Sequence, residues 1–168
     1  MDYEDYLDRM GTETEGRYDV TPLFADPGPL AELRADLLAR VPNTPTAVAG
    51  IDALGFVLGG VLATKLGVGF VSVRKGGKLP YPREELLRRE FTDYSEASKA
   101  LELHPDVLEA DDGVLLVDEW VETGTQMRAA AALIEATGAT VAGVLAIRVH
   151  ENDGTEPLFE KYDVRSIG

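Results

Sequence analysis

Residues 113–127 read G-V-L-L-V-D-E-W-V-E-T-G-T-Q-M, and this stretch decides the expected fold class. Its apolar run, residues 114–117, is typical of a strand that is buried on both faces of a parallel sheet. Asp118 and Glu119 follow at the carboxyl end of the strand, which is the edge where ligands bind in open α/β sheets. The sequence therefore predicts an α/β protein with a central, mainly parallel sheet and a ligand site beside these two acids.

The turn after the acids has the composition of a phosphate cradle. Residues 122–125 supply two hydroxyl groups and a glycine that allows the backbone to approach a ligand closely. A helix is predicted from near Gln126 to about Ala136, and the free N–H groups of its first turn favour an anion. Acids for sugar hydroxyls or a metal, followed by this cradle, predict a site for a phosphorylated ribose.

The same stretch resembles the ribose-phosphate motif of type I phosphoribosyltransferases, in which four apolar residues, two acids and two apolar residues precede A-T-G-G-T. The resemblance implies that Asp118 and Glu119 bind the ribose of phosphoribosyl pyrophosphate. It implies that the phosphate loop comprises Thr123, Gly124, Thr125 and Gln126. Two positions depart from the family pattern, because Glu122 replaces a small residue and Gln126 replaces the closing threonine.

Composition restricts the available chemistry. The 168 residues are 45% hydrophobic, which suits one globular domain with a sizeable core. The absence of cysteine excludes disulfides and thiol catalysis, and two histidines argue against a histidine-rich metal centre. No apolar run is long enough to span a bilayer and the amino terminus lacks a signal-peptide pattern, so a cytoplasmic enzyme is expected.

The formal net charge of −14, from 30 acids and 16 bases, works against nonspecific binding to nucleic acid or to an anionic membrane. Such a charge fits a halophilic source, and an ordinary acidic cytosolic protein is the alternative. In so acidic a chain, local basic clusters become informative about where a polyanionic substrate binds.

The amino-terminal part of the chain carries a second resemblance. Residues 1–16 are expected to form a weakly ordered arm or a short helix, ahead of a single domain over residues 17–168. D-V-T-P-L-F-A-D-P, at residues 19–27, is similar to a segment of adenine phosphoribosyltransferases, and a helix is predicted over residues 30–41. The resemblance implies base-binding roles for Arg17, Tyr18 and Asp19, although the aromatic residue and the arginine stand in swapped order.

A loop between a predicted strand, residues 46–50, and a predicted helix, residues 55–66, resembles the family's pyrophosphate loop. It reads G-I-D-A-L-G-F where the family typically has G-I-E-A-R-G-F. By this resemblance pyrophosphate is bound at Asp52, Ala53, Leu54 and Gly55. Leu54 replaces the usual arginine, so a pyrophosphate contact is lost unless Arg74 or a lysine supplies it.

R-K-G-G-K-L-P, at residues 74–80, is the densest positive charge in the chain and follows a predicted strand over residues 69–73. A glycine-containing basic loop suits a leaving pyrophosphate, whose negative charge grows as the glycosidic bond breaks. The loop is also similar to R-K-x-G-K-L-P of adenine phosphoribosyltransferases. The resemblance implies pyrophosphate binding by Arg74, Lys75 and Lys78, with Arg74 and Lys78 also acting in catalysis.

Residues 75–104 correspond to the family's hood over the active site. From Pro82 onward, a proline at a helix start, acids in the first turn and arginines in the last turn predict a short helix. A strand or hairpin arm is expected over residues 98–103. The resemblance implies a hood glutamate, for which Glu90 is the candidate, and a family Y-G pair that falls near Tyr94 and Ser95.

The resemblance implies that the chain moves a phosphoribosyl group from phosphoribosyl pyrophosphate to a purine nitrogen, in purine salvage, with Mg²⁺ as cofactor. Much of the magnesium coordination comes from the substrate, with Asp118 and Glu119 reaching the ion through water and no direct protein ligand assigned. The two longer matches favour adenine as the base. Because the family usually forms dimers, a homodimer is expected.

Two alternatives stay open. Glu122 resembles an aspartate that hypoxanthine-guanine phosphoribosyltransferases place toward the purine imidazole, as general base or hydrogen-bond acceptor, and this favours a 6-oxopurine; it is otherwise a surface acid. The departures at Leu54, Glu122 and Gln126 also fit a catalytically silent, nucleotide-binding regulator with the same fold. The acid pair and the intact basic loop argue against a scaffold with a vestigial site.

Overall fold

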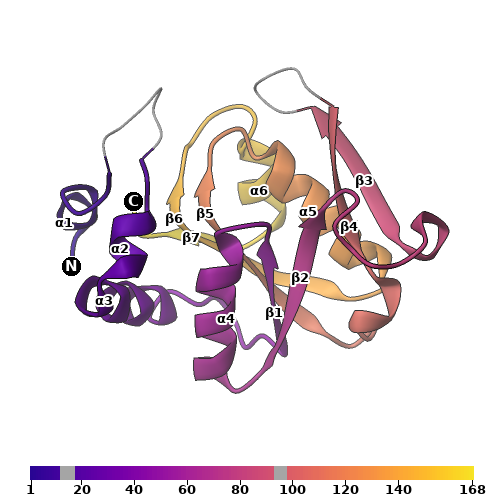
Figure 1. Ribbon diagram of the computed structural model, residues 1–168, viewed down its shortest axis with the longest axis horizontal. Helices are drawn as coiled ribbons and strands as arrows, with labels where there is room; N and C mark the ends of the chain where they lie inside the picture. Colours follow the sequence, from indigo (N-terminus) through magenta and orange to yellow (C-terminus); the bar gives the residue numbers. More distant parts are fainter. Residues whose placement is uncertain (12–17, 93–97) are drawn as a thin grey trace.

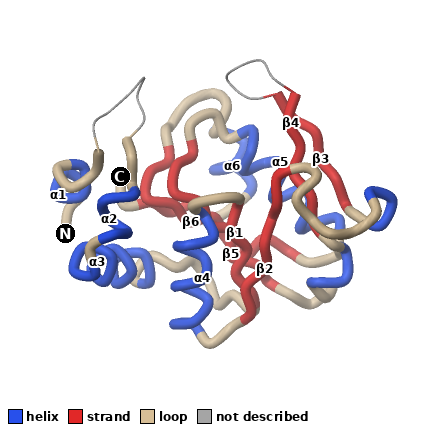
Figure 2. Tube along the Cα trace, in the orientation of Figure 1, coloured by secondary structure: helices blue, strands red, loops and turns tan. Residues whose placement is uncertain are grey.

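A computed structural model describes residues 1–11, 18–92 and 98–168. A seven-stranded sheet of order β3-β4-β2-β1-β5-β6-β7 forms its centre, with helices on both faces (Figures 1 and 2). Parallel pairing joins β1 (Ala47–Ile51), β2 (Gly69–Lys75), β5 (Gly113–Val121), β6 (Thr140–Val149) and β7 (Val164–Ser166). The strand β4 (Ser98–Leu103) runs antiparallel to β2 and to β3 (Leu87–Thr92). The predicted α/β class with a mainly parallel sheet is confirmed.

Two hydrophobic cores lie on opposite faces of the sheet. One packs against α5 (Thr125–Ala136) and α6 (Glu156–Lys161), and the other against α1 (Tyr3–Leu7), α2 (Thr21–Ala25), α3 (Pro27–Leu38) and α4 (Gly55–Leu66). The strand β5 contributes to both, because Val114 and Leu116 belong to the α5 side while Leu115 and Val117 belong to the α4 side. The apolar run of the sequence is therefore buried on both faces, as predicted. In the part of the chain that the structure describes, no helix is long and apolar enough to cross a membrane.

Most predicted elements appear close to their expected bounds. The α4 helix matches its prediction and ends where Gly67 takes a left-handed conformation (φ 71°), which glycine adopts without steric cost. The α3 helix begins three residues earlier than expected, at Pro27, because Asp26 caps it by accepting from the Gly28 N–H (2.9 Å). Proline fits the first turn of a helix, where its missing N–H would have had no intrahelical partner.

The helix predicted from Pro82 is wrong beyond a single 3₁₀ turn, Arg83–Glu85. The chain then enters β3, which pairs with β4 along its whole length. The local charge pattern favoured a helix, but long-range hydrogen bonding and an ion pair between Arg88 and Glu102 (2.5 Å) stabilise the strand instead. The strand arm predicted over residues 98–103 coincides with β4, which a second 3₁₀ turn, Pro105–Val107, follows.

The first residues of the chain form a short helix, which is one of the two structures expected for residues 1–16. Asp2 caps α1, and the fully buried side chain of Tyr6 donates a hydrogen bond to Asp36 (2.6 Å). The carbonyl of Asp19 accepts from the Gly11 N–H (2.8 Å). Residues 1–11 therefore pack on the same core as α3 and α4, and the expected division at residue 17 stays a prediction.

Candidate active site

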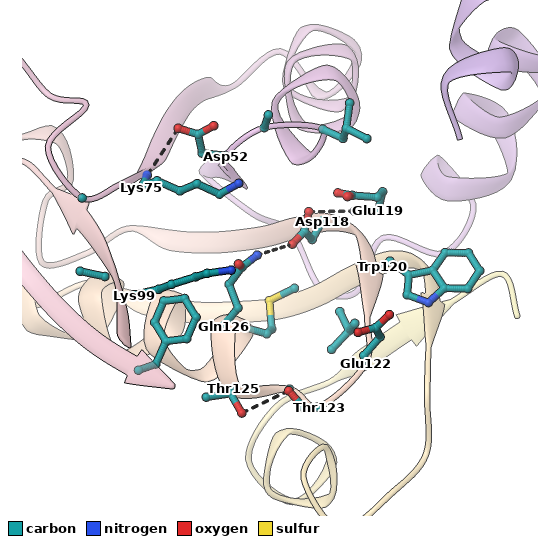
Figure 3. Close-up of a pocket in the computed structure, with 18 of the residues that line it drawn as sticks. Asp52, Lys75, Lys99, Asp118, Glu119, Trp120, Glu122, Thr123, Thr125 and Gln126 are labelled. Carbon is teal, nitrogen blue, oxygen red and sulfur yellow. Dashed lines mark hydrogen bonds between the residues drawn. The ribbon is translucent and has the colours of Figure 1, made fainter. Parts of the chain in front are cut away.

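A cavity of about 700 Å³ lies at the carboxyl-terminal edge of the parallel strands. Three parts of the chain line it: the end of β5 with the following turn, the loop after β1, and the hood strands together with the end of β2 (Figure 3). The segment at residues 18–20 closes a further side. The structure therefore brings the three sequence motifs and the amino-terminal match to one cavity.

The acid pair lies at the centre of this arrangement. Asp118 is 5% exposed, and its carboxylate accepts from the Glu119 N–H (3.0 Å) and from Nε2 of Gln126 (3.1 Å). Burial, together with the neighbouring Glu119, raises the pKa of Asp118 well above its ordinary value of 3.8. The Oε2 atom of Glu119 is buried and has no hydrogen-bond partner among the described residues. The buried carboxyl group of Asp118 and the unpartnered Oε2 of the half-buried Glu119 are suited to hydroxyl groups or a cation brought by a ligand.

The turn after β5 forms an anion cradle. Gly124 has φ 70°, and a Cβ there would lie 2.8 Å from the carbonyl oxygen of Gly154, so only glycine fits this turn without strain. No side chain caps α5, which leaves the N–H groups of its first turn available to an anion. Thr123 and Thr125 direct their hydroxyl groups toward each other (3.2 Å), and Asn152 Nδ2 donates to the Glu122 carbonyl (2.7 Å).

The predicted pyrophosphate residues divide into two groups. Asp52, Ala53, Leu54 and Lys75 line the cavity, whereas Gly55, Arg74 and Lys78 are outside its lining. Arg74 instead pairs with Asp52 (2.9 Å) and places its guanidinium 5.6 Å from the centre of the Phe56 ring. Gly55 packs against β5, because a Cβ there would lie 2.8 Å from the Val117 carbonyl oxygen. Of the three predicted cations, Lys75 lines the cavity.

The predicted base-binding and catalytic residues also divide. Tyr18, Asp19 and Glu122 line the cavity, and Arg17 lies outside the described residues, as do Tyr94 and Ser95. Asp19 caps the start of α2 by accepting from the Thr21 N–H (2.9 Å), and hydrogen bonding to Thr21 lowers the pKa of Asp19. Glu90 is exposed on β3, outside the lining, within 3.6 Å of Arg83 and 3.4 Å of Arg88.

The cavity contains residues to which the sequence had assigned no role. Trp120 places its ring 5.9 Å from that of Tyr18 and 6.0 Å from that of His150, and its Nε1 atom is buried without a partner among the described residues. Because the single tryptophan directly follows the acid pair in the sequence, Trp120 could have been predicted as a cavity residue. Hood residues complete the lining: Gly76, Arg88, Phe91, Ser98, Lys99 and Ala100. Their contribution depends on the β3–β4 register, which local sequence does not reveal.

The cavity offers oxygen ligands to Mg²⁺ but not a complete set of ligands from the protein. The described residues contain no group of three or more His, Cys, Asp or Glu that could hold a metal ion. Asp118 and the unpartnered Oε2 of Glu119 are the carboxylate oxygens best placed to contact such an ion or its waters. This donor set fits Mg²⁺, which keeps several waters and is commonly held by one or two carboxylates plus substrate phosphates.

A mainly parallel α/β sheet with an acid pair, a glycine turn at a helix start and a basic loop at one edge is typical of proteins that bind phosphorylated sugars. Residues 29–167 match the family described as the phosphoribosyl transferase domain. The chain belongs to this family of phosphoribosyltransferases.

Proteins named adenine phosphoribosyltransferase are among its relatives. The one from Methylibium petroleiphilum is 43% identical over 124 residues, which span 73% of this chain and 61% of that protein. The one from Francisella tularensis subsp. novicida is 39% identical over 152 residues, covering 89% of this chain and 85% of the relative. The crystal structure of adenine phosphoribosyltransferase from Thermoanaerobacter pseudethanolicus superposes with a TM-score of 0.86 at 29% identity, covering 98% of each chain. The resemblance inferred from the motifs is confirmed.

Proposed function

We propose that this chain is an adenine phosphoribosyltransferase of purine salvage, which joins adenine to phosphoribosyl pyrophosphate and releases AMP and pyrophosphate. One observation supports this proposal above the others: the acid pair, the cradle at the start of α5 and Lys75 of the basic loop line a single cavity. The names of its relatives, two of them about 40% identical, favour adenine as the base.

The reaction requires little covalent chemistry from the protein. A purine N–H nitrogen attacks the anomeric carbon of the ribose as the bond to pyrophosphate breaks, through an oxocarbenium-like transition state, and its proton is released to solvent. Asp118 and Glu119 accept hydrogen bonds from the ribose hydroxyls, and residues 123–126 with the first turn of α5 hold the 5-phosphate. Lys75 and the backbone of residues 52–54 hold the pyrophosphate, and Gly55, Arg74 and Lys78 stay predicted pyrophosphate residues. Glu90 stays the predicted catalytic glutamate of the hood. When bound, Mg²⁺ neutralises part of the pyrophosphate charge.

The base is proposed to bind at the side of the cavity formed by residues 18–20 and 120–122. Tyr18 and Trp120 supply aromatic surface there, and Asp19 lies beside them. Glu122 lines the same cavity, and its carboxylate would serve as a hydrogen-bond acceptor for a purine N–H. This position of Glu122 is the observation that keeps a 6-oxopurine as the second candidate substrate.

The test is pyrophosphate release from phosphoribosyl pyrophosphate and Mg²⁺ with adenine, hypoxanthine, guanine and xanthine in parallel, at low and at molar salt. Turnover with adenine supports the proposal. Turnover with an oxopurine alone would transfer the proposal to the second candidate. Saturable nucleotide binding without pyrophosphate release would leave a ligand-sensing regulator of the same fold.

We also propose that the chain forms a homodimer, is cytoplasmic, comes from a halophilic source and does not bind nucleic acid. The net charge of −14 supports the last two. Exposed apolar side chains on α4 and β2, among them Val57 and Phe70, each 38% exposed, support a partner subunit. Measurement of molar mass in solution at low and high salt checks the dimer.

A further inference from the structure

The cavity lining carries more acids than bases. Among the described lining residues there are five acids, Asp19, Asp52, Asp118, Glu119 and Glu122, and three bases, Lys75, Arg88 and Lys99. A pyrophosphate group brings several more negative charges into this acidic surrounding, so it requires well-placed positive charge. Arg74 and Lys78 do not line the cavity, and position 54 carries an uncharged leucine.

Arg88 is placed beside the basic loop. Its side chain is 28% exposed and comes from β3, across the cavity wall from the end of β2. A Cβ at Gly76 would lie 2.7 Å from Nη1 of Arg88, so the guanidinium rests directly against the loop backbone, one residue from Lys75. The glycine at position 76 is what leaves room for the guanidinium there.

Glu102 fixes the direction of this guanidinium. Its side chain is 3% exposed, on β4 and outside the cavity lining. One carboxylate oxygen accepts from Arg88 Nη1 (2.5 Å), and the other accepts from the Gly77 N–H (2.7 Å). A buried carboxylate is stable only when its oxygens are satisfied, and both are satisfied here by groups at the cavity wall. Glu102 thereby holds Arg88 and the basic loop in one arrangement.

We infer that Arg88 is a further pyrophosphate-binding residue of this site and that Glu102 is the positioning residue that aims its guanidinium. The inference rests on the proposed function and deepens it. A guanidinium has five N–H donors, so Arg88, which uses Nη1 on Glu102 and Nε on Glu90 (3.4 Å), retains donors on Nη1 and Nη2 for phosphate oxygens. Arg88 thus supplies, from the hood, the guanidinium that the loop after β1 lacks at Leu54.

The experiment measures binding of inorganic pyrophosphate with Mg²⁺ and, separately, of AMP, by calorimetry on the full chain. The variants are Arg88→Gln and Arg88→Lys, and the matched control is Arg89→Gln, which removes an exposed arginine from the next position of the same strand, outside the cavity lining. Loss of a charge-assisted hydrogen bond predicts that Arg88→Gln weakens pyrophosphate binding by about 10- to 100-fold. The affinity of Arg88→Lys for pyrophosphate is expected to lie between those of Arg88→Gln and the parent chain, because lysine keeps the charge without the planar guanidinium.

If Arg88 has only a structural role, Arg88→Gln should weaken the binding of both ligands together. If Arg88 contacts pyrophosphate, the substitution should weaken pyrophosphate binding and leave AMP binding unchanged. Equal affinities for pyrophosphate in Arg88→Gln and Arg89→Gln, or equal losses for pyrophosphate and AMP, would overturn the assignment of Arg88. A parent chain that binds neither ligand would instead overturn the proposed function.

Glu102→Gln tests the positioning role. The amide remains able to accept from one donor but loses the charge that orients Arg88, so we expect KM for phosphoribosyl pyrophosphate to rise by about 3- to 10-fold with a smaller change in kcat and in KM for adenine. An unchanged KM in a folded Glu102→Gln variant, or equal changes in both substrates' KM values, would overturn this part of the inference.

Discussion

The two walls of the cavity differ in how they hold charge. On the β5 wall, no ion pair joins Asp118 or Glu119 to a cation among the described residues, and burial raises the pKa of Asp118. On the hood wall, Glu102 and Glu90 both lie against arginines of the same hood. The difference indicates that the acid pair leaves its charge for a ligand at a cost in stability, whereas carboxylates of the hood hold its arginines in place and leave the remaining guanidinium donors for a ligand.

The strongest test of this contrast is Asp118→Asn. We expect kcat/KM to fall by at least about 100-fold, because a ribose-hydroxyl acceptor is lost where transition-state charge develops. The same change should raise the stability of the free protein, because it removes a buried carboxylate. Steady-state kinetics and thermal unfolding of the two proteins check both expectations.

The gain in stability should depend on pH with a defined sign. The folded-state pKa of Asp118 is raised above its ordinary value of 3.8, so the folded protein binds more protons than the unfolded protein between these two values. The contribution of Asp118 to stability therefore falls as pH rises through that window, whereas asparagine makes no such pH-dependent contribution. Asp118→Asn should gain more in Tm at pH 8 than at pH 4, and a variant less stable than the parent at pH 8 would contradict the contrast.

Gly124→Ala should damage the β5 wall through the backbone. Both the positive φ and the approach of the Gly154 carbonyl oppose a side chain, so we expect a loss of about 1–3 kcal/mol in the free energy of unfolding. Weaker binding of phosphoribosyl pyrophosphate should accompany it. Gly60→Ala is the matched control, because a Cβ there meets nothing within 4 Å and the residue lies inside α4. Chemical denaturation should show a neutral or stabilising effect for the control.

Glu122→Ala should have a smaller effect and sharpens the choice of base. If adenine is the substrate, kcat/KM with adenine should change by no more than about threefold, rather than the roughly 100-fold or larger loss that follows removal of a general base. The assay repeated with hypoxanthine provides the comparison. A large loss with either base would assign the acid–base role to Glu122.

The smallest effect is expected on the hood wall, from Arg83→Gln. Arg83 and Glu90 are 73% and 60% exposed and 3.6 Å apart, so their pairing is worth no more than about 0.5 kcal/mol in water. Stability and turnover should match those of the parent chain within error at physiological salt. A clear loss of stability would show that exposed ion pairs stabilise the hood wall more than the comparison of the two walls predicts.

The β5 wall could be predicted from the sequence because its parts are contiguous: the apolar strand, the acid pair and the Gly124 turn follow one another along the chain. The residues that the hood contributes to the cavity could not be predicted. Arg88 becomes a cavity residue only when β3 pairs with β4, and Glu102 is buried only in that register. Arg74 was expected in the site from its basic loop, but its pairing with Asp52, 22 positions earlier, depends on a contact that local sequence does not reveal. This pairing leaves Arg74 outside the cavity lining.

The shared strand β5 has a consequence for motion. Its side chains enter both hydrophobic cores, so its amides are expected to exchange with solvent only when the whole domain unfolds. The strand β3 pairs on one side with β4, at the edge of the sheet, and packs Leu87 and Phe91 against the core on the α5 side alone. The amides of β3 are therefore expected to exchange sooner than those of β5, which carries the acid pair and leads into the phosphate cradle.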